Sequence, residues 1–241
     1  MRVLSSEFIT SIGRKEDNTD FGLPHIAVFG KSNVGKSSFI NYFANHSKLA
    51  KVSGTPGKTR LINIFKFKLE VEKQSDIAVE VIGQGEPTST EPNNINLDRA
   101  DVADRAESAT SLTTTEFILA DFPGYGYARA PKTEIAKWTR LINDYFKNCK
   151  HLYHALCLID VRRTPSKDDL DLINYLNHHN IGFTIIATKL DKVGKTHLKK
   201  HIQNIATTLK IGADNIIGIS SYDKIGKDKV LKKLVSVLTN V

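Results

Sequence analysis

One octapeptide constrains the fold of this chain more than any other feature. GKSNVGKS (residues 30–37) matches the pattern G-x-x-x-x-G-K-[ST], directly follows the apolar run HIAVFG (25–30) and opens a helical pattern. In this context the glycines turn several backbone N–H groups toward one anion, and the helix dipole adds to the attraction. Lys36 can reach the β- and γ-phosphates of a nucleotide, and the Ser37 hydroxyl can ligate Mg²⁺. The octapeptide therefore predicts a phosphate-binding loop.

Apolar runs alternate with amphipathic segments along the chain. Six runs indicate strands, at residues 25–30, 61–71, 116–121, 154–161, 182–188 and 215–220. Five segments indicate helices, at Lys36–Ala44, Lys132–Asn148, Lys167–Asn180, Lys195–Leu209 and Lys224–Leu238. This order predicts an α/β fold with a doubly wound, mostly parallel six-stranded sheet and helices on both faces. The alternating polarity of LINIFKFKLE (61–70) predicts one antiparallel edge strand.

Charge is distributed unevenly along the chain. The formal net charge is +8, but Val71–Glu116 holds ten acidic and three basic residues, which leaves +15 on the other 195 residues. That segment shows no sustained hydrophobic period and cannot offset its ordering entropy by burial, although a short helix at 97–109 is one candidate. We expect an N-terminal extension at 1–20 and a single domain at 21–241, interrupted by a flexible acidic insertion at about 71–114. The basic remainder favours a polyanionic partner, with an ordinary solvated surface as the alternative.

The sequence also bears on the compartment. No apolar run approaches the roughly eighteen residues that a membrane span requires, and residues 1–20 resemble neither a signal nor a transit peptide. Cys149 and Cys157 do not form a metal-ligand pair, and Cys157 lies in an apolar run. We therefore expect reduced thiols in a cytoplasmic protein that does not span a membrane.

A second motif indicates the base of the nucleotide. TKLD (188–191) lies at the carboxyl end of the run GFTIIAT. Guanine presents two adjacent N–H donors that the Asp191 carboxylate can accept together, whereas adenine has no such pair. The Lys189 stem can lie over the purine, and Ile219-Ser220-Ser221 fits a loop that closes over the base. The motif favours guanine, the alternative being an ordinary surface Lys–Asp pair.

The stretch DFPGYGYARAPK (121–132) begins where the run EFILAD ends. The Asp121 carboxylate can hold Mg²⁺ through water, and the Gly124 N–H can bond a γ-phosphate, so this loop would sense that phosphate. A structural turn is the alternative, because D-x-P-G is favourable turn chemistry. Tyr125 stands where the best-known switches carry a water-positioning Gln, and a phenol is a poor base at neutral pH. We expect Tyr125 to shape the loop, and Tyr125→Phe to change turnover little; the alternative is a poor enzyme whose tyrosines form a binding surface.

Upstream, SGTPGKTR (53–60) is rich in Gly and Thr between a predicted helix and a predicted strand. Thr59 is the natural second Mg²⁺ ligand in this segment, which otherwise reads as an ordinary loop.

Taken together, these segments resemble a known family. LPHIAVFGKSNVGKSSFIN, GTPGKTRLINIF, DFPGYGYARA, the helix with Trp138, TKLDK and Ser220-Ser221 resemble the EngB/YihA-type GTP-binding proteins of the TrmE–Era–EngA–YihA–septin-like superfamily. The resemblance covers about Phe21–Val71 and Glu116–Val235 and implies a Ras-like P-loop GTPase domain. His25 and Lys31 depart from it, since an acid and an Arg are common at these positions.

The resemblance also implies a function. It implies a bacterial cytosolic GTPase that binds GTP and GDP with Mg²⁺, hydrolyses GTP slowly, and acts in assembly of the large ribosomal subunit and in cell division with its septum. The implied partner is ribosomal RNA or protein of the subunit precursor, and we expect a monomer. A GTP-sensing binding module with incidental hydrolysis is the alternative, whereas Asp191 disfavours an ATP-using enzyme.

Nucleotide contacts follow from the resemblance residue by residue. They are Gly30, Lys31, Ser32, Asn33, Val34, Gly35, Lys36, Ser37, Gly57, Lys58, Thr59, Arg60, Leu61, Asp121, Phe122, Pro123, Gly124, Thr188, Lys189, Leu190, Asp191, Ile219, Ser220 and Ser221. The implied Mg²⁺ ligands are Ser37 and Thr59. The catalytic group is unknown, and Asn33 is a candidate because in related GTPases this Asn helps hold a K⁺ ion beside the phosphates. The alternative is that Asn33 only supports the turn of the loop.

Overall fold

Strands from both halves of the chain meet in one sheet. The structure, a computed structural model, describes residues 1–14, 17–51, 61–74, 110–126 and 132–239. The chain divides into two compact units, one formed by Met1–Val71 with Thr114–Val241 and the other by Glu72–Thr113. Most of the second unit, including the helix expected at 97–109, lies outside the described residues. The first unit carries the predicted site.

The sheet contains seven strands within the described residues, in the order β1-β3-β4-β2-β5-β6-β7. Their bounds are β1 Arg2–Ile12, β2 His25–Gly30, β3 Ile62–Gln74, β4 Thr110–Asp121, β5 Leu152–Asp160, β6 Gly182–Thr188 and β7 Ile216–Gly218. Among the described strands, four neighbouring pairs are parallel: β4 with β2, β2 with β5, β5 with β6, and β6 with β7. The pair of β1 with β3 is antiparallel. The predicted α/β class with a mostly parallel sheet is confirmed.

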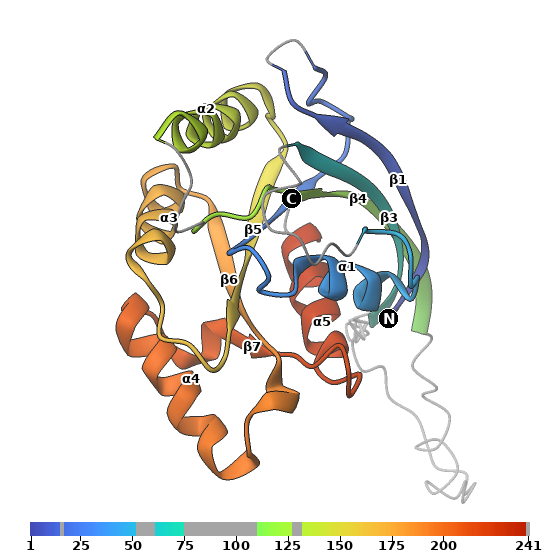
Figure 1. Cartoon of the computed structure of the whole chain (residues 1–241). Helices are drawn as coiled ribbons and strands as arrows, with labels where there is room; N and C mark the ends of the chain where they lie inside the picture. Colours follow the sequence, from blue (N-terminus) through green and yellow to red (C-terminus); the bar gives the residue numbers. More distant parts are fainter. Residues whose placement is uncertain (15–16, 52–60, 75–109, 127–131, 240–241) are drawn as a thin grey trace, which may run out of the picture. The chain divides into compact units, whose positions relative to one another are not determined.

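Helices cover the sheet on both faces. Their bounds are α1 Lys36–Ala44, α2 Lys132–Asn148, α3 Lys167–His178, α4 Lys195–Leu209 and α5 Lys227–Leu238, with short 3₁₀ turns at Leu190–Lys192 and Ala213–Asn215. In Figure 1, α2, α3 and α4 lie on one side of the sheet and α1 and α5 on the other. Successive residues of β2 serve the two faces: Ala27 and Phe29 join the core with α2–α4, and Ile26 and Val28 the core with α1 and α5. Burial on both faces explains why this strand is a continuous apolar run.

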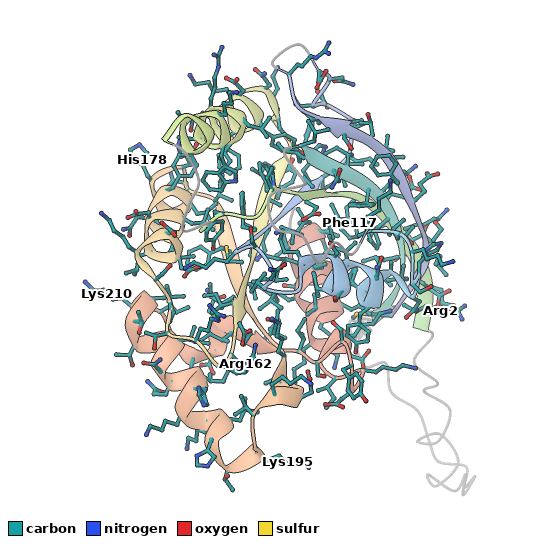
Figure 2. The ribbon with its side chains drawn as sticks, viewed as in Figure 1. Arg2, Phe117, Arg162, His178, Lys195 and Lys210 are labelled. Atoms are coloured by element: carbon teal, nitrogen blue, oxygen red, sulfur yellow. The ribbon has the colours of Figure 1, made fainter. Side chains whose placement is uncertain are left out.

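Aromatic side chains fill much of the core under α1. Phe117 of β4, labelled in Figure 2, is fully buried and stacks on Phe67 of β3 with ring centroids 5.3 Å apart. Phe67 in turn packs on Phe43 of α1, at 5.5 Å between centroids. These contacts fix β3 and β4 against the helix that begins at the phosphate loop, so the position of that loop depends on a tightly packed core.

Cys149 and Cys157 are both buried and neither forms a disulfide. Within the part of the chain that the structure describes, no helix is both long and apolar enough to cross a membrane.

The structure corrects the predicted sheet in two respects. A seventh strand, β1, lies within residues that the sequence analysis assigned to an N-terminal extension. Because β1 occupies the edge, β3 lies between β1 and β4 and is not the antiparallel edge strand that its alternating pattern predicted. Both edges of β3 are therefore paired. Its alternation arises because Phe65, Phe67, Leu69 and Val71 are buried in the core with α1 and α5 and half-buried polar residues lie between them, whereas Ile62 and Ile64 are buried in the core on the other face. Two helices are slightly shorter than predicted: α3 ends at His178 and α5 begins at Lys227.

Candidate nucleotide-binding site

The loop between β2 and α1 turns so tightly that its first position requires glycine. A Cβ added at Gly30 would lie 2.8 Å from Val34 Cγ1 and 3.0 Å from Leu158 O. At its other end Gly35 has a φ of +107°, a backbone conformation that side chains rarely adopt. Asn33 has a φ of +62°, which Asn tolerates better than most residues. The geometry therefore gives Asn33 a place in the turn, and its role toward K⁺ stays a prediction.

The N-terminus of α1 is suited to an anion. No side chain caps it, and its first turn contains no acidic residue but begins with Lys36 and Ser37. The N-terminus of α3 differs, because it carries a capping box formed by Ser166 and Asp169 and has two acidic residues in its first turn. A helix without a cap presents its first amide donors and the positive end of its dipole. These features favour phosphate at α1, as the motif predicted.

Lys36 and Asp121 form the electrostatic centre of the region. Lys36 Nζ donates to Gly30 O at 3.4 Å, and the charge of Asp121 acts on this ammonium group. Burial lowers the pKa of Lys36, and the Asp121 charge opposes that effect. Burial raises the pKa of Asp121 to about 6, although Lys36 and Asn63 act to lower it. Asp121 is only 5% exposed, and its Oδ1 has no hydrogen-bond partner among the described residues. Its surroundings therefore leave capacity for a further cationic or donor group.

These surroundings fit a magnesium ion. Mg²⁺ takes oxygen ligands, and Asp121 Oδ1 is a buried oxygen without a partner in the described part of the chain. Ser37 supplies a hydroxyl from the first turn of α1. When bound, Mg²⁺ neutralises charge on the β- and γ-phosphate oxygens. Thr59, the second predicted ligand, lies outside the described residues.

Of the other predicted contacts in that segment, Gly57, Lys58 and Arg60 also lie outside the described residues. Leu61 is described and is 43% exposed.

The end of β6 is tied to the phosphate loop by its side chains. Thr188 Oγ1 donates to Val34 O at 2.8 Å. Lys189, which has a φ of +63°, donates from Nζ to Asn33 O at 2.8 Å and pairs with Asp160 Oδ2 at 3.0 Å. The Lys189 side chain therefore bridges from the end of β6 to the phosphate loop. This position is consistent with the predicted contact of its stem with a purine.

Asp191 and Ser220 meet at the same edge of the sheet. Ser220 Oγ donates to Asp191 Oδ1 at 3.0 Å, and Lys192 Nζ lies 3.1 Å from Asp191 Oδ2. Burial acts to raise the pKa of Asp191, but the bonds from Lys192 and Ser220 outweigh it and the pKa is lowered. The loop at Ile219–Ser221 is held to this region because Leu190 N–H donates to Ile219 O at 3.2 Å. The carboxylate is therefore ionised and positioned as an acceptor.

The predicted sensing loop packs directly on the phosphate loop. Phe122 is buried, and its N–H donates to Val28 O at 3.0 Å. A Cβ at Gly124 would lie 3.0 Å from both the amide nitrogen and the hydroxyl oxygen of Ser32. Pro123 O accepts a hydrogen bond from Trp138 Nε1 at 2.9 Å. Asp121–Gly124 thus lies beside the phosphate loop, as sensing of a γ-phosphate requires.

Two acidic residues in this region escaped the sequence analysis. Asp160 ends β5, is 5% exposed, and pairs with Arg162, which Figure 2 labels, at 2.7 Å. Burial acts to raise its pKa, but bonds from Arg162 and Lys189 hold that pKa well below its usual range. Its place at the end of an apolar run, like that of Asp121, was the available signal. Asp169 is buried in the first turn of α3. The local pattern Ser166-x-x-Asp169 could have indicated its capping box, whereas its contact with Tyr125 appears only in the tertiary structure.

A P-loop followed by a doubly wound sheet, with TKLD at the end of β6, defines the class of P-loop GTPases. Residues 25–189 match the family described as "50S ribosome-binding GTPase". The "Probable GTP-binding protein EngB" of Clostridium kluyveri is 36% identical over 239 residues, which are 99% of this chain and 98% of that protein. The protein of the same name from Bacillus mycoides is 33% identical over 235 residues, 97% of this chain and 96% of that protein. The chain belongs to the EngB-type GTP-binding proteins, a GTPase family.

Solved structures agree on the fold. The crystal structure of a probable GTP-binding protein engB has a TM-score of 0.56 at 17% identity, over 90% of this chain and 100% of that one. Era from Aquifex aeolicus, bound to GDP and AlF4⁻, also has a TM-score of 0.56, at 18% identity, over 90% of this chain and 57% of that one. The Ras-like GTPase fold predicted from the sequence is confirmed.

Proposed function

We propose that this protein binds GTP with Mg²⁺, hydrolyses it slowly, and uses the GTP cycle in assembly of the large ribosomal subunit in the bacterial cytoplasm. We further propose that it is needed for normal cell division and septation. One observation carries the nucleotide part: the buried Asp121 oxygen without a described partner lies beside an uncapped, basic helix N-terminus. A nucleotide with its magnesium ion would complete both features.

Each group at the site has a distinct role in this proposal. Lys36 and the first amides of α1 would bind the phosphates, and Asp191 would accept both donors of guanine. Asp121 and Ser37 would hold Mg²⁺, with Thr59 as its second protein ligand. The Gly124 N–H would bond the γ-phosphate and so distinguish GTP from GDP.

Two findings support a ribosomal partner. The matching family is described as ribosome-binding, and the chain outside Val71–Glu116 carries a net charge of +15. Lys and Arg side chains neutralise RNA phosphates and release counterions, so binding of this kind weakens steeply with salt. The buried free thiols suit a cytoplasmic protein.

Co-sedimentation tests the ribosomal role. The full chain is mixed with large-subunit precursors in the presence of a non-hydrolysable GTP analogue, GDP or no nucleotide, at low and high salt. We expect more protein in the particle fraction with the GTP analogue than with GDP, and a steep loss at high salt. Equal sedimentation in all three nucleotide states would overturn the proposed cycle.

A second candidate function is a GTP-sensing module in which hydrolysis is incidental. It is favoured by Tyr125, which occupies the place of a water-positioning Gln and whose hydroxyl is already bonded to Asp169. GTP turnover with and without particles separates the two functions. A rise in turnover on particles supports the GTPase cycle, whereas particle binding without any rise supports the module.

A further inference from the structure

Tyr125 is neither a candidate base nor an exposed binding surface. Its side chain is 8% exposed, and its hydroxyl donates to Asp169 Oδ1 at 2.8 Å. Burial and the nearby Asp169 charge raise the pKa of Tyr125 well above its ordinary value. The hydroxyl therefore remains a proton donor to Asp169 across the physiological range, and the bond is a constant feature of this state.

The two carboxylate oxygens of Asp169 accept hydrogen bonds from two different parts of the chain. Oδ2 accepts from the Ser166 amide and the Ser166 hydroxyl, each at 2.7 Å, and so caps α3. Oδ1 faces the other way and accepts from Tyr125. Because the cap fixes the carboxylate and Asp169 is 6% exposed, Tyr125 is anchored to α3 and not to its own loop.

The backbone of Tyr125 contacts the phosphate loop on its other side. Ser32 N–H donates to Tyr125 O at 3.0 Å, and Lys31 and Tyr125 form an isolated parallel bridge. Lys31 Nζ also lies 3.8 Å from Asp169 Oδ2. The preceding residue, Gly124, is in contact range of Ser32. Any displacement of Tyr125 would therefore move the Gly124 amide relative to the phosphate loop.

A natural fluorescent reporter lies beside the contact between Tyr125 and Asp169, which we call the junction. Trp138 is the only tryptophan of the chain. Its indole N–H donates to Pro123 O, and its ring meets the Tyr125 ring edge-on at 5.7 Å between centroids. Emission from Trp138 should therefore report on the position of the sensing loop.

We propose that Asp169 is a positioning residue for GTP hydrolysis: through Tyr125 it holds Gly124 against the phosphate loop and links the sensing loop to α3. The proposal rests on the proposed function, in which the Gly124 amide binds the γ-phosphate. It changes one expectation from the sequence. Tyr125→Phe was expected to alter turnover little, but the buried bond to a carboxylate now predicts a measurable loss.

The test combines two variants at the junction with two matched controls. Tyr125→Phe and Asp169→Asn each weaken the Tyr125–Asp169 bond. Tyr175→Phe removes a different bond made by a residue of α3, from its hydroxyl to Asn143 Oδ1 at 2.5 Å, away from the sensing loop. Ser166→Ala removes only the hydroxyl donor of the α3 cap. The Ser166 amide still bonds Asp169 Oδ2 and holds the carboxylate, so Tyr125 stays bonded to Asp169. These controls separate positioning of the loop from stability of α3.

For each protein, kcat for GTP, Kd for GDP and Trp138 emission in the GDP and GTP-analogue states are measured. We expect kcat to fall about tenfold in both junction variants, because hydrogen bonds to charged groups contribute that much or more. Kd for GDP should stay within about twofold, and the emission difference between the two states should shrink. The double variant should lose no more than either single variant, since both weaken one interaction. Both controls should keep wild-type kcat and the full emission difference.

Opposite results would identify which idea is wrong. A Tyr125→Phe protein with wild-type kcat and a wild-type emission difference would overturn the positioning role while leaving the GTPase function intact. Loss of kcat in Ser166→Ala equal to that in Asp169→Asn would also overturn it, since the cap alone would then explain the effect. A wild-type protein without GTP turnover would overturn the proposed function itself.

Discussion

The two ends of the central parallel strands carry different kinds of buried polar side chain. At the carboxyl ends, β4 finishes with Asp121 and β5 with Asp160, and both carboxylates are 5% exposed. Toward the amino ends, β2 begins with His25 and β5 carries His154, which are also buried. The side of the sheet at which the parallel strands end, here called the carboxyl edge, therefore carries buried carboxylates. The side at which they begin, the amino edge, carries buried imidazoles.

The imidazoles are kept neutral by their surroundings. Burial lowers the pKa of His25 and of His154 to about 4 in each case, with smaller contributions from His151 and Lys233. His25 Nδ1 is hydrogen-bonded to the Tyr145 hydroxyl at 2.6 Å, a contact that packs α2 onto β2. This pair shows how the fold accommodates His25 as a buried neutral imidazole.

The described residues contain two buried side-chain atoms without a hydrogen-bond partner, one at each edge. They are Asp121 Oδ1 and His25 Nε2. An unpartnered neutral nitrogen costs a modest amount of folding free energy, whereas a buried carboxylate oxygen costs more and can recover it from a bound cation. We therefore propose that the carboxyl edge binds the ligand and that the histidines of the amino edge serve folding.

The largest expected effect lies at the carboxyl edge. Asp191→Asn replaces one of the two acceptor oxygens by an amide donor, so the side chain can no longer accept from both guanine donors and GTP affinity should fall by about 2–4 kcal/mol. The amide matches the 2-oxo group of xanthine, and preference should move toward xanthosine triphosphate. Calorimetric titration with both nucleotides measures this shift. Asp223→Asn, an exposed acid close to Ser220, is the matched control and should bind GTP normally. Unchanged GTP affinity in folded Asp191→Asn would remove Asp191 from the site.

The next largest expected effect is a loss of folding stability at acid pH, caused by the buried histidines of the amino edge. An imidazole whose pKa is about 4 when folded and 6.5 when unfolded binds fewer protons in the native state. Stability is therefore complete above pH 6.5 and is lost as the pH falls toward 4, by about 2 kcal/mol for each histidine at pH 5. Asp121 acts in the opposite direction, because its raised pKa destabilises the fold as the pH rises from about 4 to 6.

Urea unfolding between pH 7.5 and 5 measures this dependence. His154→Gln keeps a hydrogen-bonding group next to Thr184 but cannot titrate, so it should remove about half of the loss assigned to the two histidines. An identical pH dependence in wild type and His154→Gln would show that this histidine is not buried in neutral form.

A smaller effect is expected at Asn33. If its side chain helps hold K⁺, GTP turnover should be several-fold faster in potassium than in sodium at equal ionic strength, since a cation there neutralises phosphate charge. Asn33→Gly keeps the positive φ accessible while removing the side chain, and it should abolish the difference, as should Asn33→Ala. Equal rates of the wild-type protein in the two salts, with and without ribosomal particles, would leave Asn33 as a turn residue only.

The fold was largely predictable because its strands are buried on both faces. β2 and β6 match their apolar runs residue for residue, and α1, α2 and α4 have the predicted bounds. β1 was missed because RVLSSEFITSI is mostly exposed and contains no continuous apolar run. Its pairing with β3 depends on contacts between residues far apart in sequence, including Arg2 with Glu70. No local pattern reports such a pairing.

The candidate site, like the fold, was predictable from the sequence only where the contacts are local. Contacts within the phosphate loop and TKLD were predicted, since each is a short motif with a physical role for every fixed residue. The links between motifs were not, because they join separate elements. Thr188 to Val34, Lys189 to Asp160, and Tyr125 to Asp169 each span at least 29 residues of sequence.

One measurement tests the contrast between the two edges most directly. Thermal unfolding of wild type, Asp121→Asn and Tyr145→Phe is followed without ligand and with Mg²⁺ and a non-hydrolysable GTP analogue. Asp121→Asn should keep or raise the Tm of the unliganded protein, because a buried charge with a raised pKa is removed, but should lose most of the increase on ligand binding. Tyr145→Phe should lower the unliganded Tm by about 2–4 °C through one lost hydrogen bond, with the full increase retained.

That pattern would place ligand binding at the carboxyl edge and fold stability at the amino edge. The account would be contradicted if Asp121→Asn lowered the unliganded Tm while keeping the full ligand-induced increase.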